Sequence, residues 1–455
     1  MVPVFKKKGL KSDPAGWRPI SLTPAPCRLL ESVISDQYLV PYLTQNNLIS
    51  PVQYGFLKNR STLTQHLNLL NELTSNLENS ITSNLIYLDF SKAFDSVCHS
   101  KLIHVLNQIK IDPIILCWIT EYLSCRTQQT IVEGFLSKPS DITSGVPQGS
   151  VLGPLLFILF LEALLKILLT CDGISTYVFA DDLKLLGQNQ QQLQHALNIT
   201  TEWAKSWQLK IHDKKSEHIT FHHKQDRTTN INFSIDNSLI PQTNSVKDLG
   251  IIITNNFKWR PYVSTIYSKA IYLVYQIIKS FKSRNYKFYV NQFKLFIRPL
   301  LEYNVNAWMP ILKSDIRKVE QVQATFTRLV CRKLNIKYNN YNHRLHILNL
   351  ETLEIRRIKN NLIIMYKILN NLIDLKFDNF FKFNQNLNYY NLRRHPLALA
   401  KPPLTKTSIR RNFFNNRCIN LWNKLPEEIV VSDSLAIFKT KLNKFDLYSI
   451  YSTNL

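Results

Sequence analysis

Residues 176–186 read TYVFADDLKLL, and this stretch decides the class of fold. Two short apolar runs flank Asp181 and Asp182, which is the pattern of a β-hairpin with an acidic pair at its tip. An earlier run, LIYL at residues 85–88, is short and apolar and ends at Asp89, so we expect a buried strand there. Three carboxylates are therefore predicted at the ends of apolar strands.

The rest of the chain predicts unequal helices between further strands. Residues 151–169 are almost wholly apolar, but Glu162 and Lys166 favour a buried core helix over a membrane span. Further strands are expected at 127–132 and 249–253, and helices at 27–43, 62–77, 101–109, 190–209 and along the region after residue 255. Such an irregular order indicates an α+β fold rather than repeated βαβ units.

The expected helix at 27–43 carries an apolar stripe. A period of three to four residues gathers several large side chains on one of its faces, namely Leu29, Leu30, Val33, Ile34 and Tyr38.

The composition of the 455-residue chain excludes several classes of protein. A hydrophobic content of 45% is ample for a sizeable core, which excludes a disordered chain. Seven scattered cysteines, none in a C-x-x-C pair, argue against a disulfide framework and a zinc site and indicate a reducing compartment. The first eight residues lack the apolar core of a signal peptide, so we expect an intracellular protein of the nucleus and cytoplasm, without membrane contact.

The charge of the chain predicts a polyanionic partner. Its 56 Lys and Arg against 32 Asp and Glu give a net charge of +24, which suits nucleic acid or an acidic membrane face. Residues 249–301 contain nine basic residues and no carboxylate, and residues 401–424 contain six basic residues and no acid. These stretches are either solvated helix faces or surfaces that follow a phosphate backbone.

The acids at the strand ends contrast with this basic background. An Asp–Asp pair at a hairpin tip can be an ordinary solvated pair, but like charges brought together are costly unless cations join them. Carboxylate oxygens are ligands that Mg²⁺ prefers. Two such ions would activate a 3′-hydroxyl and neutralise a leaving pyrophosphate, as nucleotidyl transfer requires. A basic surface that binds nucleic acid and a cluster of acids that binds metal would explain why one chain carries both features.

Three motifs give the chain a specific resemblance to a family. Residues 88–95 (LDFSKAFD), 145–154 (GVPQGSVLGP) and 179–182 (FADD) occur in this order and resemble the palm motifs of reverse transcriptases. Residues 17–22 (WRPISL) and the stretch that begins QYGF at residue 53 resemble the fingers motifs of that family, and residues 246–250 (VKDLG) resemble its primer-grip hairpin. The stretches 297–303, 307–308, 320–323 and 421–426 resemble the C-terminal half of non-LTR (LINE-type) retrotransposon polymerases of the jockey and chicken-repeat kind.

The resemblance implies a catalytic metal site. Asp89 and Asp181 would be metal ligands with the Phe90 carbonyl assisting, and Asp182 would be the third catalytic acid, a metal ligand of less defined contact. The ions would be two Mg²⁺, with Mn²⁺ as an alternative.

The resemblance also implies a nucleotide site. Phe94 would lie beneath the incoming sugar and exclude a 2′-hydroxyl, unless it is an ordinary core residue. Gln148 and Gly149 would border the nucleotide, since glycine lets the backbone approach a substrate closely. Arg18 would contact template or triphosphate, with a solvated surface arginine as the alternative.

Two further assignments follow from the same resemblance. One of Lys214 and Lys215 would protonate the pyrophosphate, and their adjacency leaves both open. Leu249 and Gly250 would belong to the primer grip. The chain departs from the family pattern at several places, including Leu57, where the family often has arginine.

The implied architecture is a right-hand polymerase of the α+β class. It would comprise partial fingers at 1–80, a palm of antiparallel strands at 81–254 with a fingers insertion near 119–142, a helical thumb and basic region at 255–345, and a mainly α-helical region at 346–455. The usual endonuclease domain of such elements is expected to be absent from this chain, because Met1 lies immediately before the first fingers motif.

The implied reaction is DNA synthesis from deoxynucleoside triphosphates on an RNA template with a DNA primer. One alternative is a non-catalytic RNA-binding relic of a transposon. Another is an RNA-dependent RNA polymerase, which would need an acid five residues after Asp89 to hold a ribose hydroxyl, where this chain has Phe94.

Overall fold

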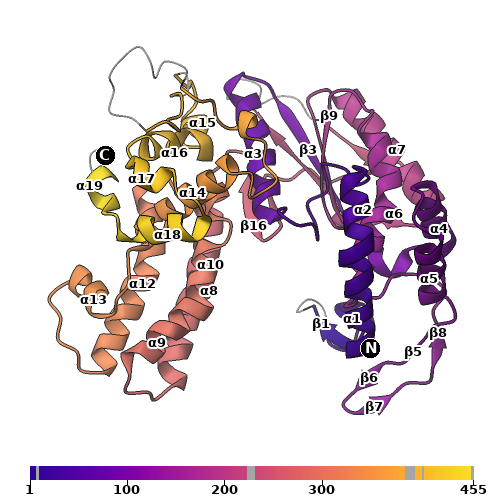
Figure 1. Cartoon of the computed structure of the whole chain (residues 1–455), viewed down its shortest axis with the longest axis horizontal. Coiled ribbons are helices and arrows are strands. Elements are labelled where there is room, and N and C mark those ends of the chain that lie inside the picture. The colour runs from indigo at the N-terminus through magenta and orange to yellow at the C-terminus, as the bar shows by residue number, and fades with distance from the viewer. Residues whose placement is uncertain (7–9, 223–230, 385–394, 402–403, 452–455) are drawn as a thin grey trace. The chain divides into compact units, whose positions relative to one another are not determined.

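The computed structural model describes residues 1–6, 10–222, 231–384, 395–401 and 404–451 (Figure 1). The chain divides into two compact units. Among the described residues, the first unit comprises 1–61, 83–220 and 231–243, and the second comprises 62–82, 221–222 and 244–451. Neither unit is therefore a continuous segment of the sequence.

The first unit is built on a four-stranded sheet with the strand order β12–β3–β10–β9. Strand β10 runs antiparallel to both neighbours, and its pairing with β3 sets Leu183 opposite Leu88. The hairpin predicted at 176–186 and the strand predicted at 85–88 are both confirmed. The strand bounds are Ser83–Leu88 for β3, Ile174–Phe179 for β9, Asp182–Gly187 for β10 and Glu217–Phe221 for β12.

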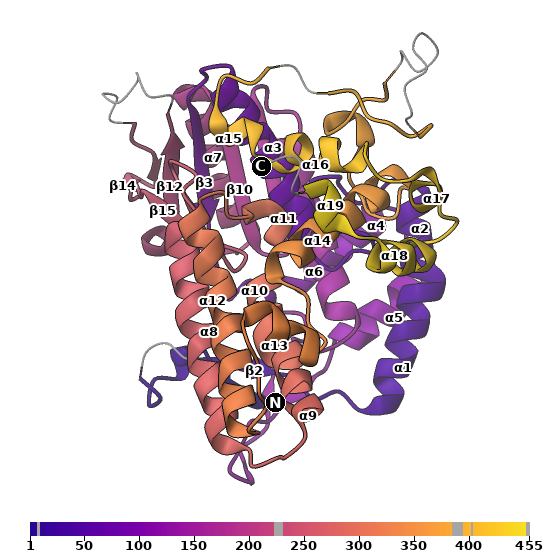
Figure 2. The same cartoon turned by 90° about the vertical axis from the view of Figure 1, so that its left-hand side faces the viewer.

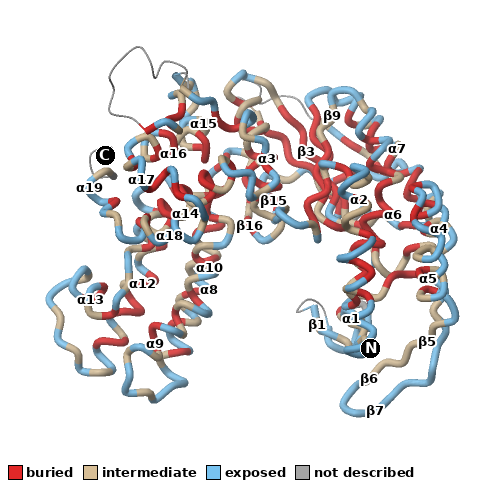
Figure 3. Tube along the Cα trace, viewed as in Figure 1, coloured by how far each residue is buried: buried red, intermediate tan, exposed pale blue. Residues whose placement is uncertain are grey.

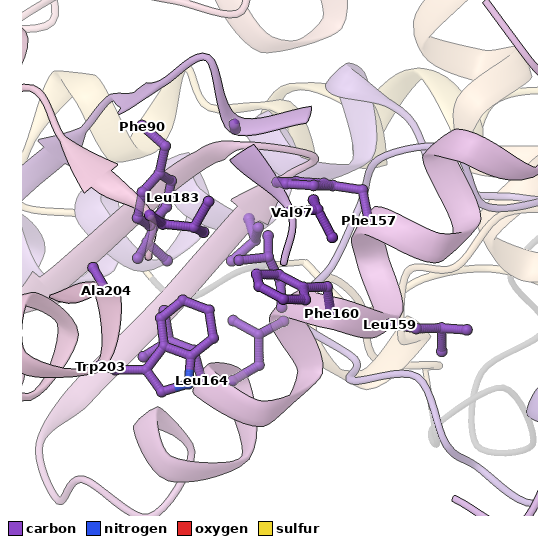
Figure 4. Close-up of a cluster of buried hydrophobic side chains, with 14 of the residues drawn as sticks. Phe90, Val97, Phe157, Leu159, Phe160, Leu164, Leu183, Trp203 and Ala204 are labelled. Carbon is purple, nitrogen blue, oxygen red and sulfur yellow. The ribbon is translucent and has the colours of Figure 1, made fainter. Parts of the chain in front are cut away.

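Helix α6 (Leu152–Leu168) forms the centre of the core of this unit, so the core helix predicted at 151–169 is confirmed. Figure 4 shows Phe157 and Phe160 of this helix among the buried side chains, together with Trp203 of α7. Full burial of each large apolar side chain contributes roughly 1.5–3 kcal/mol. No helix within the described residues is long and apolar enough to cross a membrane. The other core helices are α4 (His99–Gln108), α5 (Pro113–Leu123) and α7 (Gln190–Ser206).

The predicted helix at 27–43 is confirmed, but of the five residues of its apolar stripe only Ile34 is buried and the other four are exposed. Helix α1 (Ala25–Val33) continues through a π-helical segment (Ile34–Leu39) into α2 (Val40–Gln45). Leu29 is 69% exposed, whereas Glu31 is only 1% exposed. Glu31 is buried because its Oε2 accepts hydrogen bonds from the amides of Val151 (2.7 Å) and Leu152 (3.0 Å) and so caps the start of α6.

Short strand pairs complete the first unit. The stretch predicted as one strand at 127–132 is interrupted and supplies β5 and β6, each paired with a later strand. Figure 3 shows the β6–β7 hairpin exposed, in contrast to the buried sheet. The pairs are β1 (Val2–Phe5) with β2 (Trp17–Ile20), β4 (Phe90–Ser91) with β11 (Lys210–Ile211), β5 (Thr127–Gln128) with β8 (Ser140–Asp141), β6 (Ile131–Val132) with β7 (Phe135–Leu136), and β13 (Ser234–Ile235) with β14 (Ser238–Leu239).

The second unit is mainly helical, as predicted for the region after residue 255. Its long helices α8 (Arg260–Ser280) and α12 (Lys313–Lys333) lie side by side (Figures 1 and 2). Strands β15 (Ser245–Asp248) and β16 (Ile251–Thr254) form a hairpin, so the strand predicted at 249–253 begins later than expected. The remaining helices are α9 (Tyr286–Gln292), α10 (Arg298–Glu302), α11 (Val305–Trp308), α13 (Tyr341–Ile347), α14 (Leu353–Leu369), α15 (Ser408–Arg411), α16 (Phe414–Trp422), α17 (Glu427–Val430), α18 (Leu435–Lys444) and α19 (Leu447–Tyr451).

Helix α3 (Thr62–Glu78), predicted at 62–77, belongs to this second unit. Its last residue, Glu78, binds a segment far along the chain. The Glu78 carboxylate accepts hydrogen bonds from the amides of Lys406 and Thr407 and from the Thr407 hydroxyl (2.6 Å). Desolvation raises the pKa of Glu78, but these hydrogen bonds outweigh it and hold the pKa below its ordinary value.

Candidate active site

Two strand ends bring the predicted acids together. Because Leu183 pairs with Leu88, continuing the same register by one residue sets Asp89 opposite Asp182. Asp181 occupies the tight turn between β9 and β10, directly after Ala180, which adopts a φ of 56°. Asp182 is exposed, whereas Asp89 and Asp181 are half-buried.

The charges around the turn act on the Asp181 carboxyl. Burial raises the pKa of the Asp181 carboxyl, the negative charge of Asp89 raises it further, and the Arg18 guanidinium lowers it. Arg18 is an exposed residue of β2. Asp181, Asp89 and Arg18 therefore share one electrostatic environment, in which two carboxylates repel one another.

A cation of the protein already sits beside one of these carboxylates. Lys215 Nζ lies 3.3 Å from Asp89 Oδ2, and no described residue donates a hydrogen bond to this solvent-inaccessible oxygen. The Asp89 main-chain oxygen accepts a hydrogen bond from the His212 amide at 2.8 Å, which fixes the end of β3. The side chain of Lys214 lies outside what the structure describes.

The donor set fits a divalent cation that prefers oxygen. Among the described residues, no three His, Cys, Asp or Glu side chains form a complete metal cage. Two carboxylates that repel one another, and an Asp89 oxygen to which no described residue donates a hydrogen bond, nevertheless suit a divalent cation, and the Lys215 ammonium neutralises part of their charge. The Phe90 side chain is buried in the core, so only its main chain is available to such a site.

Gln53 holds the acidic turn in place, although sequence reasoning did not single it out. Its Oε1 accepts hydrogen bonds from the amides of Gly55 (2.8 Å) and Ala180 (3.0 Å), and the side chain is fully buried. A Cβ on Gly55 would lie 2.5 Å from the Ala180 nitrogen, so only glycine fits there. The available signal was the QYGF stretch itself, in which a glutamine stands two residues before a glycine.

The glycine-rich loop at 144–150 is held from two sides. Gln148 Nε2 donates to Asp95 Oδ1 at 2.9 Å, and the Gln148 carbonyl accepts from the Ser21 amide at 2.7 Å. Gly149 has a φ of +106°, and a Cβ there would lie 2.8 Å from the Ser21 carbonyl oxygen. Burial raises the pKa of Asp95, and the hydrogen bond from Gln148 partly counteracts this effect.

Phe94 lies at the boundary between the core and the surface. Its ring stacks on the buried ring of Phe157, with 4.4 Å between centroids and 17° between planes. On the other side, Phe56 approaches edge-on at 6.4 Å and is itself 60% exposed. The half-buried ring therefore rests on a buried ring and has an exposed aromatic neighbour, a placement that agrees with either role considered for it.

The remaining predicted site residues lie in the second unit. Leu249 and Gly250 form the turn between β15 and β16, with φ values of 39° and 94°. Leu249 is half-buried and Gly250 is exposed. The structure therefore brings Asp89, Asp181, Arg18 and Lys215 together in the first unit and places the residues expected in the primer grip in the other.

Comparisons with known proteins agree on one family. The family model described as reverse transcriptase (RNA-dependent DNA polymerase) matches residues 5–253. A probable RNA-directed DNA polymerase from transposon X-element of Drosophila melanogaster is 26% identical over 328 residues, covering 70% of this chain and 36% of the relative. The RNA-directed DNA polymerase from mobile element jockey of the same species is 24% identical over 343 residues, with 72% and 37% covered. The chain thus spans little more than a third of the length of these relatives.

Solved structures of low similarity also match. Apo telomerase from Candida tropicalis is 12% identical, with a TM-score of 0.40, over 70% of this chain and 54% of that one.

Proposed function

The chain belongs to the reverse transcriptase family, and we propose on this basis that it catalyses RNA-templated DNA synthesis from deoxynucleoside triphosphates on a DNA primer. The observation that carries the proposal is that Asp89 and the turn at Asp181 and Asp182 lie at adjoining strand ends of a strongly basic chain, where the charge of Asp89 acts on Asp181. Mutual repulsion and burial make this pair unfavourable unless a cation joins it.

Asp89 and Asp181 would hold two Mg²⁺ ions, or Mn²⁺, with the Phe90 carbonyl assisting and Asp182 as the third acid. When bound, such ions neutralise charge on the triphosphate and activate a 3′-hydroxyl. The protein contributes positioning, because Gln53 fixes the Ala180 amide next to Asp181. A rigid turn keeps the two carboxylates at a constant separation.

Other residues of the first unit would bind the incoming nucleotide. Lys215 would leave Asp89 when metal enters and could then donate a proton to the departing pyrophosphate, a role that Lys214 shares as a candidate. Arg18 would stabilise negative charge on the triphosphate or the template. Gln148 and Gly149 would border the nucleotide. Hydrogen bonds hold their loop to Asp95 and Ser21, so the loop would not need to reorganise when the nucleotide binds.

Phe94 would select the sugar. Its ring rests on Phe157 and cannot sink into the core, so a 2′-hydroxyl placed above it would meet a fixed surface. This role favours DNA synthesis over the RNA-polymerase alternative, which requires an acid at this position.

The basic residues of 249–301 support a nucleic-acid surface on the second unit. Seven of the nine are exposed, while Lys294 and Arg298 are half-buried and Arg298 lies 4.0 Å from Glu302. Exposed cations without nearby acids in sequence are suited to phosphate contacts. The seven are Lys258, Arg260, Lys269, Lys279, Lys282, Arg284 and Lys287.

The proposed architecture is a right-hand polymerase. It assigns partial fingers to 1–80, the palm to 81–254 with a fingers insertion near 119–142, the thumb to 255–345 and a helical C-terminal region to 346–455, with Leu249 and Gly250 in the primer grip. The antiparallel pairing of β10 with β3 and β9 and the helical content after residue 260 support this assignment.

Incorporation of dTTP on poly(rA)/oligo(dT) with Mg²⁺ tests the proposal. We expect template-dependent extension by the wild-type chain and none without metal. RNA binding without any extension would support the alternative of a non-catalytic RNA-binding relic, and extension with ribonucleotides alone would support an RNA polymerase.

A further inference from the structure

The turn at the tip of the β15–β16 hairpin is strained. Asp248 pairs with Ile251, and the two residues between them, Leu249 and Gly250, both have positive φ (39° and 94°). Two-residue turns of this kind favour asparagine, aspartate or glycine at the first position, because a larger side chain such as that of leucine crowds the following carbonyl in the left-handed region. A residue remains in such a conformation only when its surroundings hold it there.

Tyr303 holds this turn by direct contact. Its phenol oxygen donates a hydrogen bond to the Leu249 carbonyl oxygen at 2.8 Å. Its ring lies against Gly250, where a Cβ would come within 3.0 Å of Tyr303 Cε1. Gly250 is therefore required for two reasons, its positive φ and the closeness of the aromatic ring.

Tyr303 is itself anchored by the residues around it. The Arg356 guanidinium forms a two-point ion pair with the Glu302 carboxylate, in which Nη2 and Oε2 are 2.9 Å apart. The indole nitrogen of the fully buried Trp308 donates to the Tyr303 carbonyl oxygen at 2.6 Å. The phenol thus reaches the turn from a backbone that is fixed on either side.

A second chain of polar contacts reaches the other end of the turn. Asn304 Nδ2 lies 3.1 Å from His66 Nδ1 and 3.1 Å from Thr62 Oγ1, and Thr62 Oγ1 lies 3.2 Å from the Tyr303 phenol oxygen. On its far side, His66 Nε2 is 3.5 Å from Asp248 Oδ2, and both of these side chains are buried. The residues that flank the strained turn are therefore connected through the start of α3.

We propose that Tyr303, with Thr62, His66 and Asn304 behind it, acts as a positioning unit that holds the Leu249–Gly250 turn in the conformation that binds the primer strand. This proposal rests on the proposed function, which assigns the turn to the primer grip. The strain at Leu249 is its physical basis, because a turn meant only to connect two strands would be more stable with asparagine or glycine there. A turn that is held against strain presents the exposed backbone of Gly250 in one fixed orientation, which suits contacts with phosphates.

The test uses the full chain and the substitution Tyr303→Phe, which removes one oxygen. Hydrogen exchange of the peptide that contains residues 245–254 measures the hold on the turn. Fluorescence anisotropy measures the affinity for a labelled DNA primer annealed to RNA, with the same RNA alone as a control. Tyr366→Phe is the matched control variant, because the Tyr366 phenol also donates to a main-chain carbonyl, that of Ser432, elsewhere in the second unit.

Tyr303→Phe should speed exchange in the hairpin peptide and weaken primer–template binding by about twofold to tenfold, the range for one hydrogen bond. Binding of RNA alone should be unchanged, and Tyr366→Phe should alter neither readout. In a Leu249→Gly background the effect of Tyr303→Phe should shrink, because glycine adopts the turn without help.

Faster exchange with unaltered primer affinity would overturn the proposal, because the contacts would then be merely structural. Unaltered exchange would overturn it as well. If Tyr303→Phe does not fold, Thr62→Val, which removes the hydroxyl behind the phenol at equal volume, decides by the same two readouts. A wild-type chain that neither binds nor extends the primer would instead refute the proposed function, which separates the two failures.

Discussion

Replacing Gln53 by alanine should both destabilise the first unit and weaken its metal site. The side chain is fully buried, and its Oε1 accepts two hydrogen bonds, from Gly55 N (2.8 Å) and Ala180 N (3.0 Å). Alanine leaves both buried amides without an acceptor, at a cost of about 1–3 kcal/mol each, hence roughly 2–6 kcal/mol in total. For a unit of this size, that loss corresponds to a fall in melting temperature of roughly 4–24 °C.

The functional consequence follows from the position of the Ala180 amide. It directly precedes Asp181, so a turn that is no longer held allows the carboxylate to move relative to Asp89. Well below the melting temperature of the variant, we expect a lower kcat and a higher Mg²⁺ concentration for half-maximal incorporation. Differential scanning fluorimetry and single-nucleotide incorporation over a Mg²⁺ titration measure the two effects.

Gln323→Ala is the matched control for this prediction. Gln323 is also fully buried, and its Nε2 donates to the Glu351 carbonyl (2.8 Å) and to Tyr341 Oη (3.1 Å) within the second unit. Its removal should cost comparable stability without changing the Mg²⁺ requirement. The reasoning is refuted if Gln53→Ala unfolds earlier yet needs the same Mg²⁺ concentration as the wild type, or if its stability is unchanged.

Other substitutions test the acids, the sugar selection, a buried carboxyl and the basic surface. Asp181→Asn should abolish nucleotide incorporation and leave RNA binding nearly intact, and substantial residual polymerisation would contradict the metal role. The same substitution should raise the melting temperature of the metal-free chain, because it removes a buried charge beside Asp89. Phe94→Ala should increase incorporation of rNTPs relative to dNTPs, and an unchanged ratio of their kcat/KM values would make Phe94 a core residue only. Burial raises the pKa of Glu162, so the wild type should gain stability relative to Glu162→Gln as the pH falls, and it should lose this gain as the pH rises through the raised pKa. Melting temperatures of the two proteins that change in parallel over a pH series would contradict this prediction. Four exposed cations can be replaced by glutamine together, namely Lys279, Lys282, Arg284 and Lys287. This variant should flatten the slope of log K against log[salt] for duplex binding by roughly 0.7–0.9 for each phosphate that the protein no longer neutralises, whereas a wild-type slope would show that these charges face water.

Local pattern was sufficient for the elements that carry the acids. The apolar runs beside Asp181 and before Asp89 predicted the strands, and a two-residue connection leaves an antiparallel pair little freedom. The apolar stripe of α1 shows where such reasoning fails. Periodicity tells which residues share a helix face, but the buried face of α1 was decided by Glu31, which caps a helix more than a hundred residues away.

Contacts between distant parts of the chain explain what local pattern did not reveal. Gln53 and Ala180 are separated by 127 residues, and although each lies in a recognisable motif, nothing in the sequence shows that the two motifs are in contact. Leu249 was predicted within a strand because it is large and apolar, whereas the contact with Tyr303, 54 residues later, holds it in a turn. Tertiary contacts overrode local propensity at both positions.

The interleaving of the two units along the chain has a consequence for protein synthesis. Glu78 at the end of helix α3 binds Lys406 and Thr407, which the ribosome adds 328 and 329 residues after it. At about 5–20 residues per second, this delay amounts to roughly 15–65 s. During that time the end of α3 at Glu78 lacks this partner, although the start of the helix can already contact Asn304, and a nascent chain stalled before residue 406 would leave that end exposed. Ribosome-bound intermediates of this protein should therefore recruit chaperones through α3, long after the first unit has all of its residues outside the exit tunnel.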